Sequence, residues 1–115
     1  MGAHIITTEP VAGRVRAEFG GEVLADSTSA LLLREGSLPP RTYFPPGDVS
    51  MDRLTPTDHH TTCPFKGEAS YWSFPDGGKA GENVAWGYLE PIDGREDIRG
   101  YLSFYDDRVE LVRVD

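Results

Sequence analysis

The alternation of hydrophobic and polar residues predicts that the chain begins with a β-hairpin. Residues 14–19 (RVRAEF) alternate strictly, with charged side chains on one face and apolar side chains on the other. Two glycines follow, and residues 22–27 (EVLADS) are expected to return as the second strand. Residues 1–12 look like a lead-in, because the sequence TEP interrupts any regular element there.

Further segments are short, apolar or aromatic, and bounded by turn-forming residues. We expect strands at residues 30–35, 43–44, 68–74 and 83–89. Near the end of the chain, residues 101–105 and 108–114 are expected to pair as a hairpin across Asp106 and Asp107.

Only a little helix is expected. Residues 47–54 (GDVSMDRL) predict one short helix, which Asp48 can cap and which the sequence TPTDHH ends. Residues 90–100 form a loop with room for one helical turn. No strand–helix–strand unit of about 30 residues occurs, which disfavours a parallel α/β sheet.

Composition agrees with a single mainly β domain over residues 1–115. A chain of 115 residues and 12.7 kDa is long enough for one hydrophobic core. The 13 glycines and 9 prolines favour many turns. We therefore predict about seven short strands with one or two short helical turns.

Charge and cysteine content narrow the possible partners. The net charge of −8 and the pI of about 4.7 disfavour binding to nucleic acid or to an anionic membrane surface. No apolar run approaches the roughly 20 residues of a membrane span. The single cysteine excludes an internal disulfide, and with no signal peptide it predicts a cytoplasmic protein. We expect a monomer or a homodimer and no cofactor.

The richest chemistry lies in residues 58–72 (DHHTTCPFKGEASYW). His59, His60 and Cys63 are close enough to suggest zinc, but a structural zinc needs four ligands. The only other histidine is His4, and no second cysteine exists. The number of ligands therefore disfavours a metal site.

Cys63 and Lys66 each allow two interpretations. Cys63 is either a nucleophile, activated by His60 or Lys66 around a bend at Pro64, or a small buried hydrophobic residue. Lys66 is either an anion-binding group beside Gly67 or an ordinary surface lysine. The sequence alone leaves both questions open.

Aromatic residues occur in four segments, and they either fill the core or line a cleft. Trp86 and Tyr88 share one face of their expected strand. The aromatic residues considered are Tyr43, Tyr71, Trp72, Trp86, Tyr88 and Tyr105.

Four motifs together resemble one known family. They are Y-F-P-x-x-D-V (43–49), T-x-C-P-F-K-G-x-A-x-Y (61–71), A-W-x-Y-x-x-P (85–91) and I-x-G-Y-L-S-F-Y (98–105). In order and spacing they resemble the DUF427 family of small bacterial and fungal proteins, over residues 11–114.

The resemblance implies a β-tent-like fold, in which two antiparallel sheets lean together over a cleft. Some β-tent relatives hold zinc with two Cys-x2-Cys pairs, which this chain lacks. The family is also labelled nucleotidyltransferase-like, but no Asp-x-Asp pattern on an expected strand supports that chemistry.

The candidate site consists of the chemically active residues within these motifs. We expect a polar–aromatic cleft for a small, anionic ligand, with or without catalysis. The alternatives are a protein-interaction surface built from aromatic residues and a cysteine-dependent enzyme. Candidate catalytic residues are Cys63, Lys66 and Asp48. Candidate ligand-binding residues are Tyr43, His60, Thr62, Lys66, Tyr71, Trp86 and Tyr88.

Overall fold

The computed structural model describes residues 5–114, and the strands dominate it. His4 and the rest of the first four residues lie outside the described residues. The described part of the chain contains ten strands: β1 (Ile6–Pro10), β2 (Arg14–Phe19), β3 (Glu22–Ser27), β4 (Leu31–Glu35), β5 (Arg41–Tyr43), β6 (Thr55–Cys63), β7 (Gly67–Ser73), β8 (Ala85–Gly87), β9 (Leu102–Phe104) and β10 (Glu110–Val114).

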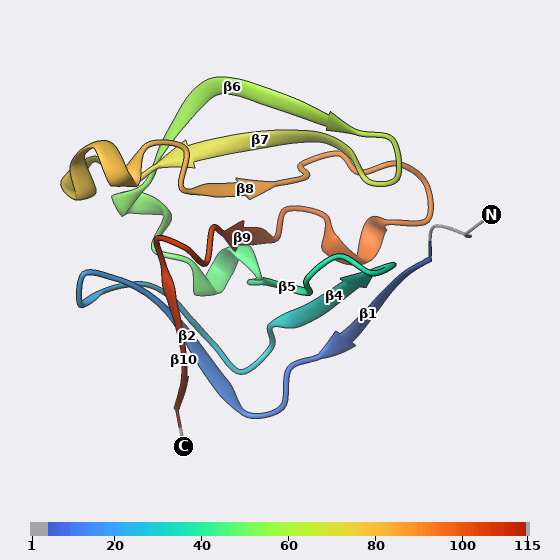
Figure 1. Ribbon diagram of the computed structural model, residues 1–115, viewed down its shortest axis with the longest axis horizontal. Coiled ribbons are helices and arrows are strands. Elements are labelled where there is room, and N and C mark those ends of the chain that lie inside the picture. The colour runs from blue at the N-terminus through green and yellow to red at the C-terminus, as the bar shows by residue number, and fades with distance from the viewer. Residues whose placement is uncertain (1–4, 115) are drawn as a thin grey trace.

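Within residues 5–114 these strands form three antiparallel sheets. The strand orders are β1-β4-β5, β10-β2-β3 and β6-β7-β8-β9. Figure 1 shows the four-stranded sheet in the upper half of the molecule and the two three-stranded sheets below it. The lower sheets diverge from each other like the two sides of a V.

A short backbone bridge joins the upper sheet to a lower one. The amide of Phe44, just after β5, donates to the carbonyl of Leu102 over 2.7 Å, and the amide of Leu102 donates back over 2.9 Å. Ser103 adds a hydroxyl bond of 2.8 Å to the carbonyl of Thr42. These contacts hold β5 against β9.

The side chains of the upper sheet are divided between two hydrophobic clusters, because successive strand residues point to opposite faces. Trp72, Ala85 and Phe104 face the first cluster, which also contains the apolar side of β2 and β3. Tyr71 and Trp86 face the second cluster, between this sheet and β4 and β5.

Four short 3-10 helices complete the described chain: η1 (Pro46–Asp48), η2 (Met51–Arg53), η3 (Pro75–Gly81) and η4 (Glu96–Ile98). Within residues 5–114, no helix has the length and apolar character needed to cross a membrane.

The structure confirms the mainly β class and the opening hairpin, which is the pair β2 and β3. It also confirms strands in the other four predicted segments and a helical turn, η4, in the 90–100 loop. The predicted number of strands was too low, and the strands lie in three sheets rather than two.

Two predicted irregular segments are in fact strands. Part of the expected lead-in is β1, which pairs with β4. Residues 55–60, read as a helix terminator, belong to the nine-residue edge strand β6. Most side chains of β6 are exposed on both faces, so the segment has no hydrophobic alternation to reveal it.

Two local predictions were wrong. The segments 101–105 and 108–114 do not pair with each other, because β9 pairs with β8 and β10 pairs with β2. The single helix over 47–54 is replaced by η1 and η2, since Val49 between them is extended and bridges to Ala25 of β3.

The bridge at Phe44 generates the first testable prediction. Phe44 is fully buried, and its ring meets Phe104 edge-on with centroids 5.8 Å apart. Phe44→Ala should lower the free energy of unfolding by about 3–5 kcal/mol, measured by urea denaturation. Leu89→Ala is the control, because Leu89 is 50% exposed and its loss should cost only about 0.5 kcal/mol. Equal costs for the two variants would contradict this role of Phe44.

Candidate functional site

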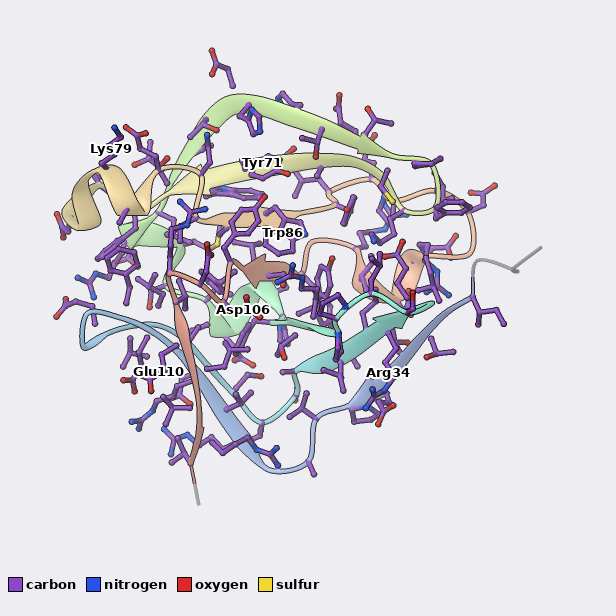
Figure 2. The ribbon with its side chains drawn as sticks, viewed as in Figure 1. Arg34, Tyr71, Lys79, Trp86, Asp106 and Glu110 are labelled. Atoms are coloured by element: carbon purple, nitrogen blue, oxygen red, sulfur yellow. The ribbon has the colours of Figure 1, made fainter. Side chains whose placement is uncertain are left out.

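The second cluster receives its aromatic side chains from β7 and β8. Tyr71 and Trp86 lie directly opposite each other in the β7–β8 register and therefore share a face. Figure 2 shows their side chains close together near the middle of the molecule. Tyr88, two residues after Trp86, is buried in the same cluster.

The opposite wall of this region comes from β4 and β5. Leu33 pairs with Arg41 and Leu31 pairs with Tyr43, so these four side chains share one face. Glu35 lies two residues beyond Leu33 and belongs to the same face. The two strands thus present a glutamate, an arginine and a tyrosine toward the aromatic residues of β8.

Between the two walls lies a cavity of about 220 Å³. Sites for drug-sized ligands usually measure roughly 300–1,000 Å³, so this cavity suits a smaller molecule. Its lining is aromatic and aliphatic with three charged residues: Leu33, Glu35, Leu38, Pro39, Arg41, Tyr43, Lys66, Trp86 and Tyr88.

A buried ion pair forms one side of the cavity. Lys66 and Glu35 are each only 8% exposed, and Nζ of Lys66 donates to Oε1 of Glu35. The ammonium group also lies 5.8 Å from the ring centroid of Tyr88. Burying either charge alone would cost several kcal/mol, so each residue depends on the other.

The backbone holds Lys66 in place from both sides. Its amide donates to the carbonyl of Cys63 over 3.2 Å, closing the β6–β7 turn. Its carbonyl accepts from the amide of Ile92 over 3.0 Å. Gly67 has φ +121° and lies so close to residues 90–92 that an added Cβ would stand 3.3 Å from the amide nitrogen of Ile92. A glycine is therefore required here.

Arg41 supplies a second cation, which is partly exposed. Its guanidinium lies 5.6 Å from the ring centroid of Trp86 and 3.4 Å from a carboxylate oxygen of Asp106. About a third of the side chain remains accessible. The cavity thus has a buried, neutralised ion pair on one side and an accessible guanidinium on another.

Burial keeps the cavity tyrosines protonated. Burial raises the pKa of Tyr43 to about 12, although the indole N–H of Trp86, which donates to its hydroxyl over 3.2 Å, opposes this rise. Burial also raises the pKa of Tyr88. Protonated hydroxyls can donate hydrogen bonds to an oxygen of a bound molecule.

Four of the nine expected site residues line this cavity: Tyr43, Lys66, Trp86 and Tyr88. Tyr71 and Cys63 belong to the surrounding cluster without lining the cavity. The hydroxyl of Tyr71 bonds Thr61 over 2.9 Å, and its ring packs 4.5 Å from that of His59.

The other three expected residues lie elsewhere. His60 and Thr62 are exposed on β6, where alternation places them on the opposite face from Cys63. Asp48 is in η1, and its carboxylate accepts a hydrogen bond of 2.7 Å from the buried Ser27 of β3. Asp48 therefore ties η1 to β3.

The sequence reasoning missed Glu35 and Arg41. Both had a signal, because alternation puts Glu35 on the same face as Leu33, and Arg41 on the same face as Tyr43. A charged residue on an otherwise apolar face points to a buried partner.

A second cavity, of about 390 Å³, lies on the other side of β4 and β5. Leu32 and Thr42 contribute to it from these strands, and Leu111 and Arg113 from β10. Leu32 and Thr42 alternate with the residues that line the first cavity, so β4 and β5 separate the two spaces. Among residues 5–114, no group of three or more His, Cys, Asp or Glu side chains is arranged to hold a metal ion.

Fold and site together define a small all-β domain with an aromatic cavity around a buried Lys–Glu pair. A family model described as a domain of unknown function (DUF427), labelled NTP_transf_9, matches residues 7–115. The chain belongs to the DUF427 family, as its four motifs suggested. No curated protein matches it.

The buried tyrosines predict a loss of stability at alkaline pH. The pKa of Tyr43 is about 12 in the folded protein and about 10 when unfolded, so the unfolded state releases its proton first. The contribution is complete below about pH 10 and falls as the pH rises toward about 12, by up to roughly 3 kcal/mol.

Urea denaturation from about pH 9 to about pH 11.5 measures this decline. Tyr43→Phe should make the decline shallower, whatever its effect on stability at neutral pH. Tyr105, whose pKa burial likewise raises to about 12, and Tyr88 should sustain the remaining decline. An identical slope in Tyr43→Phe would contradict the assignment.

Gly67 provides a third prediction. Gly67→Ala should destabilise the protein by about 1–3 kcal/mol, because of its positive φ and its contact with residues 90–92. Gly47→Ala is a matched control, since an added Cβ at Gly47 has no neighbour within 4 Å among the described atoms. Thermal unfolding of both variants distinguishes them, and a neutral Gly67→Ala would refute the backbone argument.

Proposed function

We propose that this DUF427 domain binds a small, anionic molecule in the cavity between β4–β5 and β8. The observation that supports the proposal is a cavity of about 220 Å³ that combines aromatic walls, the buried Lys66–Glu35 pair and the accessible guanidinium of Arg41. Aromatic walls with a few convergent polar groups are typical of small-molecule sites.

Anion binding in this proposal depends on Arg41 more than on Lys66. Glu35 already neutralises the charge of Lys66, whereas Arg41 retains accessible N–H donors beside its contact with Asp106. Guanidinium groups bind carboxylates through two parallel hydrogen bonds. Since the chain as a whole carries a net charge of −8, an anion needs such a local cation.

Size and lining limit the ligand further. Leu33, Leu38 and Pro39 offer aliphatic contact, and Trp86 and Tyr88 offer ring faces. A short apolar body with one acidic group matches this lining. A complete nucleotide is too large for a space of about 220 Å³.

The two alternative functions, a protein-interaction surface and a cysteine-dependent enzyme, stay predictions. An interaction surface built on exposed aromatic residues would have to do without Trp72 and Trp86, which are 7% and 8% exposed. A reactive Cys63 would act from a half-buried position at the end of β6.

Fluorescence tests the proposal directly. The chain has two tryptophans, so Trp72→Phe leaves Trp86 as the single reporter in the cavity wall. We expect titration with isocaproate, benzoate or inorganic phosphate to give a saturable change in Trp86 emission, strongest for the carboxylates.

The arginines supply matched controls. Arg41→Gln should raise the Kd for isocaproate about tenfold, because a charged hydrogen bond is lost. Arg34→Gln should leave the Kd unchanged, since Arg34 lies on the other face of β4 and pairs with Glu9. No emission change with any of the three probes, or equal effects of the two substitutions, would refute the proposal.

A further inference from the structure

The Lys66–Glu35 pair is unusual among the ion pairs of the described residues because both partners are buried and both line a cavity. The other ion pairs involve side chains that are between about a fifth and four-fifths exposed. A structural pair of this kind could be replaced by apolar residues without loss of stability. Its position on the cavity wall suggests that the amine takes part in chemistry there.

We infer that Lys66 forms a Schiff base with a small α-keto acid, whose carboxylate is bound by Arg41. This inference rests on the proposed function and names its substrate class. A lysine becomes nucleophilic when an adjacent general base takes its proton, and Glu35 is in hydrogen-bond contact with Nζ of Lys66.

The positions of the two cations match an α-keto acid. Glu35 is the diagonal neighbour of Arg41 across the β4–β5 pair, because Arg41 lies opposite Leu33. Diagonal neighbours have Cα atoms about 7–8 Å apart, so Lys66, bound to Glu35, and Arg41 converge on one small space from different directions. An α-keto acid carries both groups in one compact molecule, with the ketone carbonyl for Lys66 and the carboxylate for Arg41.

The reaction balances with the groups present. Glu35 takes one proton from the Lys66 ammonium, and the nitrogen lone pair then forms a C–N bond to the ketone carbon. The C=O π electrons move to oxygen, which gains a proton from the new ammonium to give a carbinolamine. Glu35 returns its proton to this hydroxyl, which leaves as water while a C=N bond forms. The product is a protonated imine beside an ionised Glu35, with no oxidant or reductant consumed.

The cavity walls favour these reaction steps. The hydroxyl of Tyr43 accepts a hydrogen bond from Trp86 and can donate one to the ketone oxygen while keeping its proton. The charge pair present at the start, ammonium and carboxylate, is preserved at the end as iminium and carboxylate. The leucine and proline side chains of the lining accommodate the apolar part of the acid.

Reductive trapping tests the inference with an internal control. The chain has two lysines, Lys66 and Lys79, and Lys79 is exposed on η3, at the left edge of Figure 2 and away from Trp86. The intact protein is treated with α-ketoisocaproate and cyanoborohydride, and peptides are mapped by mass spectrometry. Lys66 should be alkylated at least about tenfold faster than Lys79. Equal rates would overturn the inference.

Variants separate the roles of the partners. Lys66→Arg keeps a cation opposite Glu35 and should abolish the adduct on that peptide. Glu35→Gln should slow trapping about 100-fold, while Glu9→Gln, an exposed glutamate on β1, should not. If Lys66→Arg fails to fold, the comparison of Lys66 with Lys79 in the unsubstituted chain still tests whether Lys66 forms the Schiff base.

Matched small molecules separate this inference from the proposed function. Methyl isobutyl ketone lacks the carboxylate and should label Lys66 at least about tenfold more slowly; equal labelling would overturn the keto-acid class. Isocaproate lacks the ketone and should bind without forming an adduct. If both acids change Trp86 emission but Lys66 is never trapped, binding stands and the Schiff base is refuted. If neither acid changes the emission and no adduct forms, the proposed function itself fails.

Discussion

One buried pair of charges, Lys66 and Glu35, constrains how two different sheets pack together. Lys66 lies in the turn between β6 and β7, and Glu35 ends β4, 31 residues earlier in the chain. Burying either charge without its partner would cost several kcal/mol, so the packing of the two sheets has to keep Lys66 and Glu35 in contact. Gly67 allows the chain to pass close to residues 90–92, and this contact directs Lys66 inward.

Parts of the fold that bury one face of a strand were predictable from the sequence. The hairpin of residues 14–27 shows the alternation of a half-buried sheet, and the structure has it. Strand β6 has no such pattern, because it is an edge strand that is mostly exposed on both faces. The pairing of β10 with β2 joins opposite ends of the chain, and no local pattern distinguishes it from a hairpin with the nearby β9.

The candidate site was also predictable only where the sequence carries a local signal. Aromatic residues in the motifs pointed to the region of Tyr43, Trp86 and Tyr88, since large side chains mark a cluster wherever they fold together. Glu35 acquires its importance only from a contact with a distant lysine, which a single sequence does not encode locally. Asp48 looked functional because carboxylates are rarely needed for packing, yet here one fixes a turn to a strand by accepting from Ser27.

The strands β4 and β5 separate two cavities with a wall only one strand layer thick. Arg41 and Tyr43 face one space and Thr42 faces the other, so the two spaces lie on opposite sides of β5. A larger side chain at one position of β5 that pushes the strand outward must narrow the cavity behind it. A one-residue insertion before β5 that shifts its register would turn Arg41 and Tyr43 away from the first cavity and Thr42 away from the second. A change in the length of the segment from 36 to 40 that moves β5 therefore alters both cavities at once.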